Sequence, residues 1–305
     1  MTKLQFFIHS DQDGCRVSTL LRRDCHCSAR LIKQLKYLPE GILLNGQRVF
    51  LDHRVAAGQT LPLQLPPDPP SDLVPVAHTL ELPFEDEHLL IVNKPPCVPV
   101  HSGPGHHNDS LGNYLAWHHQ GRGTHYTYRP VNRLDRPTSG LMCVAKHAYA
   151  QERLKNQLHT RQFRRIYLAL CDGALFPEQG TIQAPIGRAV GSVLKREVRS
   201  DGAAAVTHYR CLWSDGIRSL VQLELETGRT HQIRVHLSHL GFPLTGDFLY
   251  GIEQPELISR TALHSWALSF QHPVTSAVVS CFAPLPEDMS ALVPPAILSQ
   301  VVLND

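Results

Sequence analysis

The chain has 305 residues and a formal net charge of +2 at pH 7. Its length suits one large domain with a smaller second domain. Because the net charge is small, any prediction of nucleic-acid binding must rest on where the cations lie in the chain. The composition excludes a strongly basic protein, and no apolar run reaches the length of a signal peptide or membrane span. We therefore expect a cytoplasmic protein whose eight cysteines are reduced thiols.

The first clear pattern in the chain is a short basic helix over Ser28–Tyr37. Apolar residues form a stripe along it and cations occupy the remaining surface: Leu31, Ile32 and Leu35 in the stripe, and Arg30, Lys33 and Lys36 outside it. The Asn-Gly pair within Gly41–Phe50 then predicts a tight hairpin, and Gly58–Leu63 supplies a turn and a short strand. These elements predict a compact α+β unit over residues 1–65.

This unit resembles, over residues 10–65, the alpha-L RNA-binding module that a ribosomal small-subunit protein shares with several RNA-modifying enzymes. The resemblance implies that the helix and hairpin present cations to folded RNA. Four residues would be the phosphate contacts: Arg30, Lys33, Lys36 and Arg48. The alternative is that each of these cations lies on a surface exposed to water and does not contact RNA.

Residues 66–81 are rich in proline and aspartate, which extends the backbone and predicts a linker. Residues 82–305 then form the second predicted domain. Its apolar runs predict buried strands: Glu87–Pro96, Leu141–Lys146, Phe163–Leu170, Ile217–Leu225, and an antiparallel pair at Ala262–Phe270 and Val274–Phe282. Many strands with few helices and short connections predict an α+β domain with a mixed, mainly antiparallel central sheet.

The loop Val131–Gly140 contains the first chemically suggestive group. Asp135 lies between Arg133 and Arg136, on a loop that ends in the turn-forming residues Thr138-Ser139-Gly140. One carboxylate flanked by two guanidinium groups suits a lone nucleophile or base. A buried ion pair that merely joins two loops is the structural alternative.

A second loop, Thr227–Leu237, joins the strand Ile217–Leu225 to a predicted helix that ends at Gly241. Thr230 is the expected N-cap. A cation at Arg229 beside the positive end of the helix dipole is unfavourable unless an anion lies opposite, and Asp135 is the natural candidate for that anion.

Several segments together resemble the RluA-type pseudouridine synthases. The aspartate motif of that family is matched by Asn132–Gly140, its tyrosine strand by Arg165–Ala169, and its arginine motif by Gly228–His236. Gly241–Asp247, followed by Tyr250-Gly251 and Ala262–His264, continues the match in family order, so that the resemblance covers about residues 82–285. Asn132 and Pro137 depart from the histidine and aspartate of the family motif, and we expect them to alter how the loop is held or how it contacts RNA.

The resemblance implies a pseudouridine synthase fold and the isomerisation of uridine in structured RNA, ribosomal or transfer, with no metal and no organic cofactor. It implies that Asp135 is the catalytic carboxylate and that Arg229 pairs with it. Tyr167 would lie against the target uracil, Leu263 would line the base pocket, and Arg133 would hold the flipped nucleotide or fill its place. Two routes stay open, in which Asp135 adds to the anomeric carbon or removes the neighbouring ribose proton.

Two other functions are compatible with parts of the pattern. A non-catalytic RNA-binding or ribosome-assembly factor needs no carboxylate facing phosphates, and a glycosidase needs a second acid that this motif lacks. Cys25-His26-Cys27 lacks the spacing of a zinc knuckle. We therefore expect a monomeric RNA pseudouridine synthase whose partner is RNA and which needs no protein partner or membrane.

Overall fold

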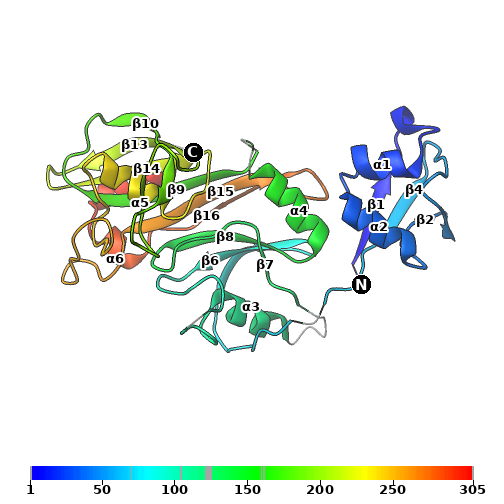
Figure 1. Ribbon diagram of the computed structural model, residues 1–305, viewed down its shortest axis with the longest axis horizontal. Helices are drawn as coiled ribbons and strands as arrows, with labels where there is room; N and C mark the ends of the chain where they lie inside the picture. The colour runs from blue at the N-terminus through cyan, green and yellow to red at the C-terminus, as the bar shows by residue number, and fades with distance from the viewer. Residues whose placement is uncertain are drawn as a thin grey trace.

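The structure is a computed structural model that describes residues 2–69, 71–103, 105–120, 126–158, 160 and 162–303. Figure 1 shows a small N-terminal unit, in blue, beside a larger part built on a broad twisted sheet. Within these described ranges, no helix combines the length and the apolar character that crossing a bilayer requires.

The N-terminal unit closes by pairing its first strand with its last. β1 (Lys3–Phe7) runs antiparallel to β4 (Thr60–Gln64). The elements between them are a 3₁₀ turn at Ser10–Gln12, α1 (Val17–Arg23), α2 (Ala29–Tyr37), β2 (Leu43–Leu44) and β3 (Gln47–Arg48). Buried apolar side chains from β1, α1, α2, β2 and β4 form the core of this unit. The sequence did not predict β1 or α1, because each is too short for its periodicity to stand out.

The predicted basic helix and hairpin are both present in this unit. Ser28 caps α2, since its hydroxyl accepts a hydrogen bond from the Leu31 N–H at 3.2 Å. Asn45 and Gly46 connect β2 and β3 with φ values of +49° and +79°, the conformation of a type I′ turn. The short pattern Asn-Gly between apolar residues was therefore sufficient to predict this turn.

The N-terminal unit is attached to the larger part through α4 (Ala148–Gln157). Tyr149 of this helix is buried in the N-terminal core, where its hydroxyl donates to the Cys25 carbonyl at 2.8 Å. The Tyr149 ring also meets Phe6 edge-on, with centroids 6.3 Å apart. One aromatic side chain therefore links the two cores, as the placement of α4 beside the blue unit in Figure 1 illustrates.

The predicted linker is extended and follows the surface of α3 (Leu111–Gln120). The Asn113 side-chain amide donates to the Val74 carbonyl at 2.8 Å, and the Asn113 carbonyl accepts from the Val76 N–H. Asp68 forms an ion pair with Arg129 at 2.6 Å. The proline-rich segment is therefore held against the larger part by specific polar contacts.

The larger part contains a mixed sheet, which in the described residues has ten strands in the order β10-β13-β14-β9-β15-β8-β6-β5, with β16 beside β15 and β7 beside β8. The strands are β5 (Glu81–Glu85), β6 (Leu89–Lys94), β7 (Arg129–Pro130), β8 (Ser139–Ala145), β9 (Arg164–Asp172), β10 (Gln179–Gln183), β13 (Val206–Ser214), β14 (Arg218–Leu225), β15 (Leu263–Gln271) and β16 (Val278–Phe282). All pairs are antiparallel except β8 with β15. The prediction of a mixed, mainly antiparallel sheet is confirmed.

Both faces of the sheet are covered. Along β9, Tyr167 and Ala169 face one core, while Ile166 and Leu168 face another. α5 (Gln232–His239) contributes to the first core, and the C-terminal helices α6 (Glu287–Ser290) and α7 (Pro295–Leu303) lie near the second. A small hairpin, β11 (Ile186–Arg188) with β12 (Arg196–Val198), projects beside α5.

The parallel pairing of β8 with β15 depends on Gly140. Its φ is +105°, and a Cβ atom there would lie 2.3 Å from the Ser265 carbonyl oxygen. The backbones of the two strands can therefore approach this closely only because residue 140 has no side chain. This contact fixes the end of the Asp135 loop against β15.

We expect Gly140→Ala to lower the free energy of unfolding by about 3 kcal/mol, because backbone strain adds to a clash with rigid backbone. Gly216→Ala is the matched control: its φ is +87°, but nothing lies within 4 Å of the added Cβ, so only about 1 kcal/mol of strain applies. Urea unfolding followed by circular dichroism measures both. Equal losses for the two variants would contradict the role of the close approach.

Candidate active site

Asp135 lies in the loop between β7 and β8 and faces a cavity of about 640 Å³. Its side chain is 24% exposed, so it is accessible from the cavity without being fully solvated. Among the described residues that line the cavity, five are arginine or lysine and Asp135 is the one acid. These cations are Arg133, Lys155, Arg165, Arg229 and Arg234. The cavity is therefore electropositive around a single carboxylate, which suits an anionic ligand.

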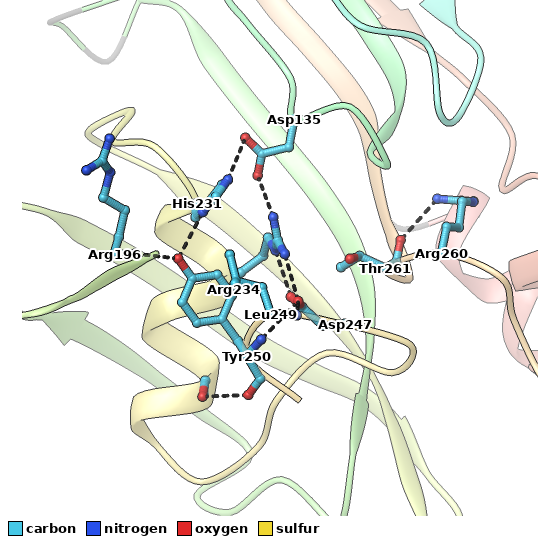
Figure 2. A network of polar contacts seen from close by, with 10 residues as sticks. Asp135, Arg196, His231, Arg234, Asp247, Leu249, Tyr250, Arg260 and Thr261 are labelled. Carbon is cyan, nitrogen blue, oxygen red and sulfur yellow. Dashed lines mark hydrogen bonds and ion pairs between the residues drawn. The ribbon is translucent and has the colours of Figure 1, made fainter. Parts of the chain in front are cut away.

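Arg234 is the arginine that faces Asp135 (Figure 2). Its Nη1 lies 3.6 Å from Asp135 Oδ2. On its other side, Arg234 donates two hydrogen bonds of 2.7 Å from Nε and Nη2 to the carboxylate of Asp247, which is fully buried. Asp247 also accepts hydrogen bonds from the N–H groups of Leu249 and Tyr250. The buried Asp247 carboxylate thus fixes the Arg234 side chain, and the third guanidinium nitrogen, Nη1, faces Asp135.

His231 supplies a second group beside the carboxylate. Its Nε2 lies 4.0 Å from Asp135 Oδ1, and its Nδ1 is 2.9 Å from the Tyr250 hydroxyl. Burial lowers the pKa of His231, although the neighbouring Asp135 acts in the opposite direction. The Tyr250 hydroxyl accepts a hydrogen bond from the Arg196 N–H, which joins this network to the β11–β12 hairpin.

The expected pair between Arg229 and Asp135 is wrong. Arg229 is exposed, and its Nε donates to the Ala204 carbonyl at 3.0 Å. The expected N-cap is also wrong: His231, with φ of +58°, occupies that position in place of Thr230. The helix therefore starts after the left-handed turn at His231, and Arg234 in its first turn is directed inward while Arg229 remains outside. The anion expected opposite the helix is indeed Asp135, but its guanidinium partner is five residues further along.

Two buried groups that the sequence analysis missed, Lys94 and Arg260, hold the Asp135 loop in place. The Lys94 ammonium donates to the carbonyls of Pro95, Val98 and Arg136. Arg260 donates to the Pro137 carbonyl at 3.2 Å while it pairs with Asp288. A lysine at the end of an apolar strand and directly before two prolines was the available signal for Lys94.

Asn132, one of the two departures from the family motif, is buried at the start of the loop. Its Oδ1 accepts a hydrogen bond from the Cys143 N–H at 2.8 Å, which ties the loop to β8. Pro137, the other departure, offers its carbonyl to Arg260. Both substituted positions therefore contribute to holding the loop, and neither touches the carboxylate of Asp135 in the hydrogen bonds of the described residues.

The other expected pocket residues also line the cavity. Tyr167 on β9 and Leu263 at the start of β15 are 5% and 4% exposed, and they supply an apolar wall. Burial raises the pKa of Tyr167; Arg165 opposes this effect and Asp135 adds to it, and the hydroxyl keeps its proton at neutral pH. Arg133 is exposed at the cavity rim. Asp135, Tyr167, Leu263 and Arg133 are therefore brought together, although the arginine beside Asp135 was misassigned.

The four cations expected to contact RNA lie on the N-terminal unit. Arg30, Lys33 and Lys36 are exposed on α2, and Arg48 is exposed on β3. Arg48 donates from Nη2 to the Lys36 carbonyl at 3.0 Å, which connects the hairpin to the end of the helix.

One group of side chains in the described residues could hold a metal ion. Glu85, His118 and His119 place their ligand atoms within 4.8 Å of one another. Lys146 already pairs with Glu85 at 2.7 Å, and none of these residues is among those that line the Asp135 cavity.

The arrangement around Asp135 instead offers one carboxylate, fixed cations and an apolar wall. These are the groups needed for acid–base or nucleophilic chemistry on a flat, uncharged ring attached to an anionic chain.

Comparisons with known proteins agree with this chemistry. A family model described as RNA pseudouridylate synthase matches residues 88–239. The chain is 41% identical over 267 residues to the uncharacterized RNA pseudouridine synthase YjbO of Bacillus subtilis, a match that covers 87% of this chain and 94% of that protein. It is 39% identical over 264 residues to ribosomal large subunit pseudouridine synthase D of Xylella fastidiosa, which covers 82% and 80% of the two chains.

Solved structures show the same likeness. The human RNA pseudouridylate synthase domain containing 1 superposes with a TM-score of 0.58 at 26% identity, over 74% of this chain and 96% of that one.

Lys94 gives a testable pH dependence of stability. Burial lowers its pKa to about 7 from an ordinary value of 10.5. Between these two pH values the unfolded chain binds a proton that the folded chain does not, so stability should rise with pH in this window. We expect the difference in unfolding free energy, wild type minus Lys94→Met, to grow by up to about 1.4 kcal/mol per pH unit above pH 7. Urea unfolding at several pH values measures it, and a constant difference would contradict the lowered pKa.

Proposed function

We infer that this chain, which belongs to the RNA pseudouridylate synthase family, isomerises uridine to pseudouridine at the cavity around Asp135. Family membership makes the chain an RNA pseudouridine synthase, and RNA its substrate. The observation that carries the assignment of the site is the position of Asp135, the one acid among the described residues of an electropositive cavity, opposite the buried pair of Arg234 with Asp247.

Asp135 is the proposed catalytic carboxylate. The reaction breaks the bond between the anomeric carbon and the base nitrogen and rejoins uracil through carbon 5. Release of the base puts positive character on the sugar, which Asp135 can relieve either by adding to the anomeric carbon or by removing the neighbouring ribose proton. Arg234 fixes the carboxylate without neutralising it fully, because Asp247 already takes two of its donors.

The apolar wall has a separate task. Uracil within a helix cannot reach Asp135, so the nucleotide must swing out of the stack, at a cost of a few kcal/mol. Tyr167 and Leu263 then provide a flat dry surface for the base, and the protonated Tyr167 hydroxyl is available near carbon 5. Water exclusion matters because water that captured the sugar would leave an abasic site. Arg133 and Arg229 at the exposed side of the cavity are proposed contacts for the phosphates next to the target nucleotide.

We assign residues 1–65 as an alpha-L-type RNA-binding module, 66–81 as a linker and 82–305 as the catalytic domain. Exposed Arg30, Lys33, Lys36 and Arg48 support RNA binding by the module. Ribosomal RNA is the proposed substrate, as the names of several relatives suggest. We also propose a monomer that needs no protein partner and acts in the cytoplasm, where it meets this RNA.

The reaction is tested on RNA from cells with and without this protein, by mass spectrometry after chemical labelling of pseudouridine. We expect at least one ribosomal uridine to lose its label in the deletion strain. Complementation with Asp135→Asn should not restore it, although the variant should bind RNA with nearly wild-type affinity, since the change removes charge but little volume. Unchanged labelling at every uridine would contradict the proposal, and release of free uracil would indicate a glycosidase.

The corrected arginine assignment makes a second prediction. Arg234→Lys should lower kcat by about 100-fold or more, because a lysine cannot bind Asp247 with two hydrogen bonds and face Asp135 as well. Arg229→Lys is the matched control and should leave kcat within a few-fold, because lysine keeps the positive charge proposed to meet a phosphate and the Arg229 guanidinium donates to the Ala204 carbonyl, away from Asp135. Single-turnover assays on a transcript containing the target site separate kcat from binding. Equal losses of kcat for both variants would contradict the assignment.

A further inference from the structure

Three aromatic side chains of the N-terminal unit are exposed, and two of them, Tyr37 and Phe50, lie beside cations. Tyr37, the last residue of α2, is 70% exposed, and Phe50, which follows β3, is 62% exposed. Burial of a large ring is ordinarily favourable, so two exposed rings in so small a unit indicate a surface that a ligand covers.

A cation accompanies each ring. The Lys36 ammonium lies 5.7 Å from the centroid of Tyr37, and the Arg48 guanidinium lies 5.6 Å from that of Phe50. The hydrogen bond from Arg48 to the Lys36 carbonyl brings the two cation–ring pairs together at the junction of α2 and the β2–β3 hairpin. We call this set of Lys36, Tyr37, Arg48 and Phe50 the aromatic platform.

The charge around the platform identifies the class of ligand. Residues 1–65 contain nine lysines and arginines and five acids, a net charge of +4, although the whole chain has only +2. α2 itself contains no acidic residue. In the described residues neither Lys36 nor Arg48 forms an ion pair. A surface that combines exposed rings with such cations is complementary to nucleic acid, whose bases stack on rings while phosphates meet cations.

We propose that the aromatic platform binds unpaired nucleotides of the substrate RNA by stacking their bases on Tyr37 and Phe50. Bases in a duplex are covered by their neighbours and present no free face, so the rings select a single-stranded segment. The proposal rests on the proposed function, since RNA is the substrate. Because the N-terminal unit lies at the end of the molecule remote from α5, the stacked segment is distinct from the target uridine (Figure 1).

The probes are a fluorescein-labelled ten-nucleotide oligouridine and a labelled blunt twelve-base-pair RNA duplex, titrated with the full chain by fluorescence anisotropy at several KCl concentrations. We expect the double variant Tyr37→Ala, Phe50→Ala to bind oligouridine about tenfold or more weakly, with an unchanged slope of log affinity against log salt. Its affinity for the duplex should stay within about twofold, since stacking is not used there. Lys33→Ala should instead lower the salt slope by about 0.7 with oligouridine.

Phe7→Ala is the matched control, because Phe7 is a 58% exposed ring of the same unit but is paired with His9. It should bind both probes like the wild type, and all variants should share one melting temperature. The proposal is overturned if the wild type does not bind oligouridine, or if the double variant binds it like the wild type, as a protein-docking surface would. Equal losses on both probes would overturn it as well.

These failures are distinguishable from failure of the proposed function. Pseudouridine formation by the wild type in cellular RNA tests the enzyme activity alone. If labelling shows the modification while the double variant keeps its affinity for oligouridine, only the aromatic platform is wrong. If the wild type makes no pseudouridine, the proposed function is wrong.

Discussion

The pair of Arg234 with Asp247 is the interaction on which the site depends. Both side chains are almost completely buried, so each would carry a large desolvation cost alone. Two short hydrogen bonds between them, and two more from backbone N–H groups to Asp247, offset that cost and fix the guanidinium in one orientation. A cation that is already fixed can hold Asp135 at 3.6 Å with no further loss of side-chain freedom when substrate arrives.

The sheet places the Asp135 loop beside the apolar wall formed by Tyr167 and Leu263. β9 and β8 lie on either side of the first residues of β15, so Tyr167, the Asp135 loop and Leu263 meet although they are far apart in sequence. The close approach at Gly140 sets the distance between the loop and β15. Because β8 and β15 are buried along nearly their whole length, the loop is attached to the most rigid part of the fold, and rigid attachment is what a positioned carboxylate requires.

The sequence was most informative where local chemistry decides the structure. The apolar strand runs, the Asn45-Gly46 turn and the basic helix over Ser28–Tyr37 were all predicted, because each depends on neighbours in the chain. Choosing between Arg229 and Arg234 required the backbone of His231, and a left-handed residue at a helix start has no signature in single-residue propensities. Lys94 and Arg260 were missed for a related reason: their partners are carbonyl groups brought near by the tertiary fold, which no side-chain pattern records.

The distribution of charge separates the two tasks of the molecule. The excess of cations lies in residues 1–65, whereas residues 66–305 contain more acids than lysines and arginines. Among the described residues, five of the cations of this second part line the cavity beside Asp135. Long-range attraction of RNA would then act mainly on the N-terminal unit, and the catalytic cavity would receive a strand that is already bound nearby. Such capture requires that the two parts keep a defined spacing. Tyr149 meets this requirement, because its ring belongs to the N-terminal core while its backbone belongs to α4, which borders the cavity through Gln151 and Lys155.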